Sequence, residues 1–325
     1  MKEKILITGG CGFIGSHLTE YLLKKKKRVL VFDQYNSNGD IGWLKYIKKT
    51  KNLDIILGDI RDYDSVFKVM HSCNKVVHLA ALIGIPYSYR SPISYLKTNI
   101  EGTYNILEAA KFLKIKKTII TSTSEVYGSA QYTPIDEKHP LVGQSPYSAS
   151  KIAADQLAIS YIRSFDIPIV IARPFNVFGP RQSARAIIPT IILQILKGKK
   201  NINLGNLSTL RDFTFVEDTC RAFDTILSSK SNKKETYNIG NNRNISIGDL
   251  ANLIATLMKK EIKINQVKLR KRKQTSEVNK LLCDNNLIFK DLKWMPKKSF
   301  VTGLKDTINW YKKNMNLYED ENYQI

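Results

Sequence analysis

Five residues that supply acid, base and hydroxyl groups lie within one short stretch of the chain. They are Thr123, Ser124 and Glu125 in the segment TSTSEVYG, and Tyr147 and Lys151 in the segment SPYSASK. Tyr147 and Lys151 are four residues apart, so on a helix they share one face and the ammonium group can reach the phenol. A phenol normally titrates near pH ~10, and a nearby cation favours the phenolate, which makes Tyr147 a candidate general base. The set is typical of enzymes that transfer a proton and a hydride.

The Tyr-x-x-x-Lys spacing alone does not establish this chemistry. Tyr147 and Lys151 also fit an ordinary aromatic residue and an ordinary lysine on an amphipathic helix, because both residue types are common in this chain. The interpretation therefore depends on the elements that surround the pair.

A glycine-rich turn near the beginning of the chain has the sequence context of a dinucleotide site. The apolar run KILIT, residues 4–8, leads into GGCGFIG, and a helical pattern covers residues 16–25. Gly9 permits the tight turn, Gly12 lets the backbone approach a pyrophosphate, and Gly15 lets the helix pack on the sheet. We expect Phe13 and Ile14, between these glycines, to contact the cofactor as well.

The second expected strand, residues 28–32, ends at Asp33. A carboxylate at this place accepts both hydroxyls of an adenosine ribose and repels a 2'-phosphate, so it favours NAD over NADP. The alternative is an aspartate that caps a turn at the end of a strand. Asn36, slightly further along, is also within reach of the ribose.

Four further apolar runs predict strands at residues 53–57, 75–79, 118–122 and 168–172. Helical patterns cover about 93–112, 187–196, 247–259 and 301–311, and a tyrosine-rich loop is expected at 85–89. The alternation predicts an α/β fold: a Rossmann-type doubly wound parallel sheet with helices on both faces, plus a smaller interleaved C-terminal α/β substrate domain. We expect the NAD-binding domain at 1–178, with part of 207–242 returning to it, and the substrate-binding domain at 179–325.

Ligands bind at the carboxyl ends of the strands in such sheets, and small residues there let a cofactor pass close to the backbone. The other residues expected at the cofactor are Asp59, Ile60, Leu79, Ala80, Ala81, Asn99, Ser122 and Pro174, together with Tyr147 and Lys151.

Composition excludes several classes of protein. The content of 43% hydrophobic and 25% charged residues is that of a soluble globular protein, and no apolar run reaches the ~18 residues of a membrane span. The first residues enter a strand-like run directly, so we expect no secretory segment and a cytoplasmic location. Four scattered cysteines and four scattered histidines predict neither a disulfide framework nor a metal site.

The formal charge of +22 raises the possibility of a nucleic-acid partner. Most lysines fall at the ends of helices and in turns, and the one dense basic run without a helical pattern is 268–273. No nucleic-acid motif accompanies this charge, so we expect a solvated surface and no nucleic-acid or membrane partner.

Taken together, these segments resemble the extended short-chain dehydrogenase/reductases that act on nucleotide sugars. The motifs are GGCGFIG, GDI, HLAA, TSTSEVYG, SPYSASK, RPFNVFGPR, RDFTFVEDT and the late NWY helix, and they cover nearly the whole chain. A further set is similar to the bacterial N-acetylglucosamine-nucleotide 4,6-dehydratases of legionaminic acid biosynthesis: YNSN, AALIGIPYSY, YTPIDEKHPL, GPRQSARAIIPTII and SEVNKLLCDN. The resemblance implies NAD as cofactor and GDP-N-acetylglucosamine, or its UDP counterpart, as substrate.

The resemblance also implies roles for the catalytic residues. Tyr147, activated by Lys151 and by the charge of oxidised nicotinamide, takes the proton of the sugar C4 hydroxyl while NAD accepts the hydride, and Thr123 holds the oxygen. Glu125 then acts as base at C5, water leaves C6 with Glu125 or Ser124 handling the proton, and the hydride returns to C6. Ser124 stands at a position where dTDP-glucose dehydratases often have Asp and where GDP-mannose dehydratases have Ser, as this chain does. The identity of the acid that protonates the leaving hydroxyl therefore stays open.

Substrate contacts are expected from seven residues, each with an alternative structural role. They are Tyr87, Thr123, Asn176, Arg181, Arg185, Arg211 and Arg272. The motif-matched Arg211 and Arg272 suit a diphosphate, because a guanidinium fork fits its oxygens, although Lys273 stands where relatives often have Pro. The arginines could otherwise be solvated, Asn176 could cap a loop, and Tyr87 could be a packing residue.

Other functions remain open at this stage. A nucleotide-sugar C4 epimerase shares Tyr147 and Lys151 but has no need of Glu125, whereas a UDP-glucuronate decarboxylase shares even the TSEVYG string. A non-catalytic NAD- or RNA-binding protein is a distant alternative. The resemblance further implies a homodimer with a four-helix interface formed by the helix after Glu101 and the Tyr147 helix.

Overall fold

The computed structural model describes residues 3–230, 234–267 and 274–318. At its centre lies a seven-stranded sheet in the order β10-β6-β5-β4-β1-β2-β3, in which every pairing is parallel. The strands are β1 (Lys4–Thr8), β2 (Arg28–Gln34), β3 (Leu53–Gly58), β4 (Lys75–His78), β5 (Lys117–Thr121), β6 (Ile169–Pro174) and β10 (Thr236–Ile239). This arrangement confirms the predicted Rossmann-type sheet.

Successive residues of the central strands supply two separate cores, because side chains of a strand alternate between its faces. Ile5 and Ile7 of β1 belong to one apolar cluster, and Leu6 between them belongs to another. A parallel sheet buried on both faces needs apolar residues at nearly every position, which explains the continuous Val, Ile and Leu runs in the sequence.

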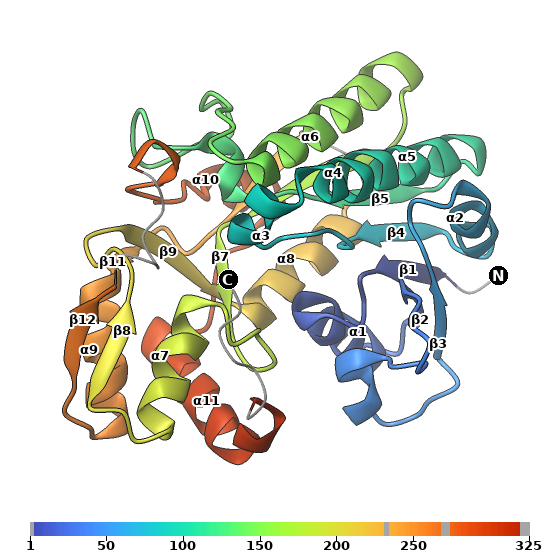
Figure 1. Ribbon diagram of the computed structural model, residues 1–325. Helices are drawn as coiled ribbons and strands as arrows, with labels where there is room; N and C mark the ends of the chain where they lie inside the picture. The colour runs from blue at the N-terminus through green and yellow to red at the C-terminus, as the bar shows by residue number, and fades with distance from the viewer. Residues whose placement is uncertain (1–2, 231–233, 268–273, 319–325) are drawn as a thin grey trace.

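Helices cover both faces (Figure 1). The first cluster contains residues of α1 (Phe13–Lys24) and α8 (Val216–Ser228), and the second contains residues of α2 (Tyr63–Met70), α5 (Gly102–Phe112) and α6 (Pro146–Phe165). Figure 1 shows α4, α5 and α6 together on one side of the sheet.

The second half of the chain leaves the main sheet and then returns to it. After β6 come β7 (Asn176–Phe178), α7 (Ile187–Leu196), β8 (Asn201–Leu204) and β9 (Leu210–Phe215). Then β10 pairs with β6, and the chain continues through β11 (Asn244–Ser246), α9 (Ile247–Met258), β12 (Lys263–Gln266), α10 (Asn286–Leu292) and α11 (Phe300–Lys313). β11, β9 and β7 form a three-stranded sheet, and β12 pairs with β8. The smaller region is thus interleaved with the main sheet.

One segment differs from the prediction. Residues 85–89, expected as a loop, belong to the helix α3 (Ile85–Arg90), because proline in the first turn of a helix costs no hydrogen bond. The predicted long helix that follows consists of α4 (Pro92–Tyr95), a π-helical stretch η2 (Leu96–Glu101) and α5.

Short helical turns complete the fold: η1 (Gly42–Tyr46), η3 (Ser124–Tyr127), η5 (Gln274–Ser276) and η6 (Met315–Tyr318). Among the described residues, no helix combines the length and apolar character that a membrane span requires.

Candidate active site

The TSTSEVYG segment turns sharply where β5 ends. The backbone N–H of Ser122 donates to the carbonyl of Ala172 on β6 at 2.7 Å, which keeps the chain in the sheet. Thr123 then caps η3, and its hydroxyl accepts a hydrogen bond from the backbone N–H of Glu125 at 3.2 Å. Thr123 and Glu125, both half-buried, therefore lie at the carboxyl edge of the sheet, where ligands bind, whereas Ser124 between them is only 2% exposed.

The α6 helix brings Tyr147 and Lys151 to this edge. Ser145 begins it with a reciprocal capping box to Ser148, and Pro146 occupies its first turn, so the position of the helix start is well determined. The Lys151 ammonium donates to the carbonyl of Thr121 at 2.6 Å, and the Thr123 hydroxyl is hydrogen-bonded to the Tyr147 phenol. The structure thus brings together the catalytic residues predicted from the sequence.

Burial controls the titration of this pair. It raises the pKa of the Tyr147 phenol, with a further rise from the charge of Glu125, although the hydrogen bond from Thr123 opposes the shift. It also lowers the pKa of Lys151 to about 8, against an opposing effect of Asp155. Desolvation dominates both groups in the chain alone, whereas the expected lowering of the Tyr147 pKa includes the charge of the oxidised nicotinamide and stays a prediction.

Tyr95, which the sequence did not single out, packs against the catalytic phenol. Its ring meets that of Tyr147 edge-on with centroids 6.2 Å apart, and its hydroxyl donates to the carbonyl of Gly84 at 2.5 Å. Tyr95 is 1% exposed and also contacts the ring of Tyr87, which is 47% exposed. A core position on a helix gives no sequence signal that separates such a residue from ordinary packing.

The glycine turn leaves no room for a side chain at two of its positions. Gly9 has φ of +70°, and a Cβ there would lie 2.8 Å from the backbone nitrogen of Ala80. A Cβ on Gly15 would lie 2.2 Å from the carbonyl oxygen of Gly9. Gly12 precedes α1 without a side-chain cap, so the helix N-terminus remains available to an anion. The partly buried Phe13 and Ile14 begin this helix.

Asp33 lines a hollow of about 350 Å³ with Cys11, Gln34, Tyr35, Asn36, Asp40 and Gly42. Its carboxylate accepts the backbone N–H of Cys11 at 2.6 Å and that of Gln34 at 2.7 Å, which fixes the rotamer. The Asn36 side chain binds the backbone of Asp40. The hollow, the fixed carboxylate and the glycine turn fit the adenosine end of a dinucleotide.

Several other residues predicted at the cofactor already have protein partners. Asp59 pairs with Arg61, whose hydrogen bonds lower the pKa of that carboxyl. Asn99 is 1% exposed, and its amide binds the backbone of Leu82 and the hydroxyl of Ser150. Asn99 therefore fixes the loop after β4 against α6.

The remaining predicted cofactor residues lie where their strands end or just beyond. Ile60 is buried after β3, Leu79, Ala80 and Ala81 follow β4, Ser122 follows β5, and Pro174 ends β6. The backbone N–H groups of Leu79 and Ala80 bind Thr8 on β1. These residues share one edge of the sheet.

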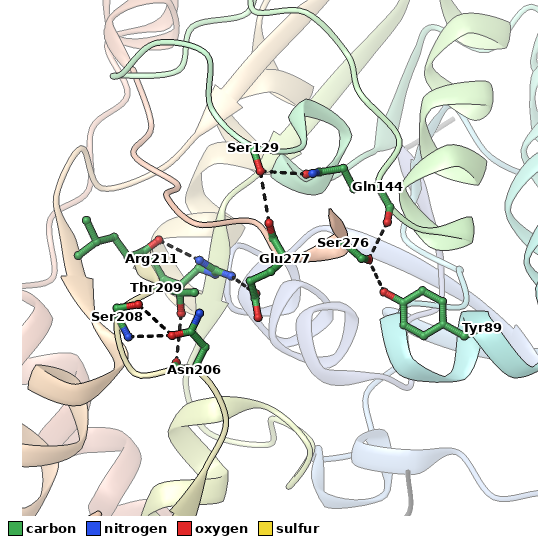
Figure 2. Close-up of polar contacts among 10 residues, drawn as sticks. Tyr89, Ser129, Gln144, Asn206, Ser208, Thr209, Arg211, Ser276 and Glu277 are labelled. Carbon is green, nitrogen blue, oxygen red and sulfur yellow. Dashed lines mark hydrogen bonds and ion pairs between the residues drawn. The ribbon is translucent and has the colours of Figure 1, made fainter. Parts of the chain in front are cut away.

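Arg211 lies on β9, in the smaller region. Figure 2 shows its guanidinium beside Glu277, with Nη2 donating to the carboxylate at 3.4 Å and Nη1 to the carbonyl of Leu210 at 3.1 Å. The two side chains are only 10% and 13% exposed. Its expected companion Arg272 and Lys273, like the basic run 268–273, lie outside the described residues.

The segment that carries Glu277 also touches the other half of the molecule (Figure 2). The Ser276 hydroxyl meets that of Tyr89 at 2.5 Å and donates to the carbonyl of Gln144 at 2.7 Å. The Ser129 hydroxyl donates to the carbonyl of Glu277 at 3.3 Å. Ser276 and Glu277 thus connect β9 to α3 and to the segment between η3 and α6.

The other predicted substrate residues are dispersed. Arg181 pairs with Glu20 of α1 at 2.8 Å, so the structure does not bring it to Arg211. Arg185 is exposed, and its charge acts on Tyr95. The side-chain oxygen of Asn176 is covered by protein atoms and lacks a hydrogen-bond partner among the described residues.

The described residues contain no group of three or more His, Cys, Asp or Glu side chains that could hold a metal ion.

Comparison with known proteins gives a consistent picture. The family model of GDP-mannose 4,6-dehydratase matches residues 6–307. The chain is 37% identical to a dTDP-D-glucose 4,6-dehydratase of Dictyostelium discoideum over 78% of its own length and 62% of that protein. It is 34% identical to a UDP-glucuronate 4-epimerase of Thermodesulfobacterium geofontis over 96% of this chain and 97% of the other.

The crystal structure of DesIV, a dTDP-glucose 4,6-dehydratase from Streptomyces venezuelae with NAD and TYD bound, superposes with a TM-score of 0.89. The two chains are 27% identical, and the alignment covers 97% of this chain and 99% of DesIV. The chain belongs to the GDP-mannose 4,6-dehydratase family of extended short-chain dehydrogenase/reductases, a family that uses NAD.

Proposed function

We propose that this family member catalyses the 4,6-dehydration of a nucleotide-linked N-acetylglucosamine, with GDP-N-acetylglucosamine as the substrate, in nonulosonic (legionaminic) acid biosynthesis. The observation that carries the dehydration is the position of Glu125, on the same turn as Thr123 and at the edge where Tyr147 lies. An epimerase needs only the removal and return of hydrogen at C4. Elimination of water additionally needs a base at C5, and Glu125 supplies a carboxylate there.

Four residues carry the proton transfers in this proposal. Tyr147 accepts the proton of the C4 hydroxyl, and the Thr123 hydroxyl, already bonded to the phenol, orients the oxygen. Glu125 removes the proton at C5, and Glu125 or Ser124 returns a proton to the departing C6 hydroxyl. NAD, when bound, would accept the C4 hydride and return it to C6.

The glycine turn and Asp33 would hold this cofactor. Gly9, Gly12 and Gly15 allow the pyrophosphate to approach the backbone and the N-terminus of α1, and Asp33 would accept the ribose hydroxyls. Since burial raises the pKa of Tyr147, the positive charge of the oxidised nicotinamide ring is the proposed source of its activation.

The choice of sugar and nucleotide rests on the sequence resemblance. The motifs SEVNKLLCDN and GPRQSARAIIPTII are the ones shared with the N-acetylglucosamine-nucleotide dehydratases, and Glu277 of the first lies against Arg211. A UDP-linked substrate is the alternative within the same reaction. The second candidate reaction is C4 epimerisation, which the UDP-glucuronate 4-epimerase relative favours.

One assay separates these reactions. The purified protein is incubated with NAD and a panel of GDP- and UDP-sugars, and the product mass is followed. Loss of one water from GDP-N-acetylglucosamine is expected. Loss of carbon dioxide from UDP-glucuronate, or an epimer of unchanged mass, contradicts the proposal.

The Glu125→Gln variant tests the base. It should still oxidise C4, seen as NADH absorbance, but should form dehydrated product about 100-fold more slowly or worse. Deuterium from solvent should no longer enter C5. Normal dehydration by this variant would assign the base elsewhere.

We also propose that two copies of the chain pair through α5 and α6. The outer surface of these helices carries exposed apolar side chains, and a shallow hollow of about 440 Å³ is lined by Leu96, Lys97, Ile100, Glu101, Tyr104 and Leu157. Sedimentation should show a dimer, and Tyr104→Glu should shift it toward monomer. A wild-type monomer at micromolar concentration would contradict this interface.

A further inference from the structure

A fully buried carboxylate lies one helical turn beyond Lys151. Asp155 is 0% exposed, on the same helix α6, and its spacing from Lys151 places the two side chains on one face. The proposed mechanism gives this residue no task.

One oxygen of Asp155 joins three structural elements. Oδ2 accepts the hydroxyl of Ser122 at 2.8 Å and Nε of Arg173 at 3.0 Å. Ser122 lies between Thr121 and Thr123. The carbonyl of Thr121 accepts a hydrogen bond from the Lys151 ammonium, and the hydroxyl of Thr123 is hydrogen-bonded to Tyr147. The Asp155 carboxylate therefore joins α6 to the end of β5, next to the contacts that Lys151 and Tyr147 make with Thr121 and Thr123.

The other oxygen of Asp155 is unused. Oδ1 is buried and has no hydrogen-bond partner among the described residues. An unpaired carboxylate oxygen in the protein interior is costly, and a nearby cation reduces that cost. Lys151 is 3% exposed, and the charge of Asp155 raises its pKa against the larger, opposite effect of burial.

A line of buried hydrogen bonds braces the carboxylate from behind. Nη1 of Arg173 donates to the Tyr127 hydroxyl at 2.9 Å, and that hydroxyl donates to the Asn238 side chain on β10 at 2.7 Å. The guanidinium also lies over the Tyr127 ring, 5.1 Å from its centroid. Arg173 thus contacts both Asp155 and Tyr127; burial raises the pKa of the Asp155 carboxyl, and the charge of Arg173 and the hydrogen bond from Ser122 oppose that rise.

The other charged and titratable groups near Lys151 do not replace this effect. Burial lowers the pKa of His78 on β4 to about 3, so its imidazole is neutral, and Arg173 on β6 is a cation like Lys151 itself. Tyr147 on the same helix is a neutral phenol, and Glu125 on η3 acts on Tyr147. Asp155 is the negative group that opposes the desolvation of Lys151.

We infer that Asp155 is a positioning residue for the proposed reaction, which fixes the Thr121–Thr123 turn against α6 and keeps Lys151 in its ammonium form. The inference rests on the proposed function and deepens it, since a cation at Lys151 would favour the Tyr147 phenolate together with the charge of the oxidised nicotinamide. Two sequence features carried the signal without being used: the four-residue spacing from Lys151, and an arginine on the neighbouring strand.

The test measures the titration of Lys151 directly. Full-length protein loaded with NAD and carrying ¹³C-labelled lysine is titrated by NMR, and the Lys151 resonance is assigned with Lys151→Met. In Asp155→Asn, which is nearly isosteric, the midpoint should fall by about one pH unit or more. The alkaline limb of the pH–rate profile should move in the same direction by a similar amount.

Tyr127→Phe is the matched control. It removes one hydroxyl from the same buried network but no charge, so it should lower the melting temperature and leave the Lys151 midpoint unchanged. An unchanged midpoint in Asp155→Asn, or an equal shift in both variants, overturns the inference. If Asp155→Asn does not fold, Asp155→Glu carries the test: it retains the charge, so a midpoint as in wild type supports the inference and a large downward shift overturns it.

The NMR titration needs no substrate. A shifted midpoint in a protein that fails to dehydrate any nucleotide sugar would therefore refute the proposed function while leaving the role of Asp155 intact.

Discussion

The two ends of the proposed substrate site are built in different ways. At the hydride end, Tyr147, Lys151 and the Thr123 turn come from adjacent elements, are nearly all buried, and are joined by hydrogen bonds to the backbone of β5. At the diphosphate end, Arg211 on β9 meets Glu277, which is 66 residues further along the chain. The first end is fixed before any ligand binds, whereas at the second a protein carboxylate lies where the proposed anion would bind.

This difference separates catalysis from recognition. Changes at the hydride end should act on kcat, because the groups there touch the reacting atoms. Changes at the diphosphate end should act mainly on KM, because they alter binding that is the same in ground and transition states.

The largest effect is expected at the hydride end. Tyr147→Phe removes the proton acceptor without changing the ring that packs on Tyr95, so kcat should fall by about 1,000-fold with little change in KM. Steady-state assays of product mass measure both constants. A similar loss from Tyr95→Phe, which keeps the packing and loses only a hydroxyl bonded to Gly84, would show that the effect is structural.

A smaller effect, on KM rather than on kcat, is expected from the Arg211–Glu277 ion pair at the diphosphate end. Arg211→Gln should raise KM by about 10- to 100-fold, the loss of a charged hydrogen bond, with kcat changed far less. Glu277→Gln removes the carboxylate that would compete with the diphosphate. The dissociation constant of GDP, measured by titration calorimetry, should therefore fall. Weaker GDP binding in Glu277→Gln would mean that Glu277 contacts the nucleotide itself, and the comparison would fail.

Acid should weaken the hydride end through His78. The Thr8 hydroxyl and Nδ1 of this buried imidazole form a hydrogen bond of 2.7 Å, and burial lowers the pKa of the imidazole from 6.5 to about 3. The unfolded chain thus binds a proton at higher pH than the folded chain, so the stability from neutral His78 is complete above pH 6.5 and is lost as pH falls toward 3. At pH 5 the loss should be about 2 kcal/mol, measured by urea unfolding, with a shallower pH dependence in His78→Asn.

The smallest effect is expected at the contact between Tyr89 and Ser276. Both hydroxyls lie in exposed surroundings, so Tyr89→Phe should cost about 0.5–1 kcal/mol of unfolding free energy. Thermal unfolding measures it, with Tyr132→Phe, another exposed tyrosine hydroxyl bonded to Asp136, as control. A loss of several kcal/mol would show that this segment is as tightly fixed as the hydride end.

The sequence predicted the hydride end because its signals are local. The strand ends, the glycine turn and the Tyr147–Lys151 spacing each lie within a few residues, and the parallel sheet brings strand ends to one edge. The rise that burial gives the pKa of Tyr147 in the chain alone could not be predicted, because burial is a property of the folded molecule and spacing along the chain does not report it.

The pairs that join distant segments could not be predicted in this way. Glu277 stands in a recognised motif, but its pairing with Arg211 depends on how residues 274–284 pass between β9 and Ile135. Asp155 and Arg173 meet because α6 packs on the sheet beside β6. Likewise, a loop was predicted at α3 because proline and tyrosines are common in turns. The structure shows that the proline lies in the first turn of a helix, where it is tolerated.

The return of β10 to the main sheet limits how this protein can be divided. A fragment ending at residue 178 would contain six of the sheet's strands but would leave the outer edge of β6 unpaired, and it would lack Asn238, which braces Tyr127. The region proposed to bind the substrate therefore cannot be exchanged as a terminal module. A chimaera designed to accept another nucleotide sugar would have to graft the insertion between β6 and β10 and the segments after β10 separately, and leave β10 in place.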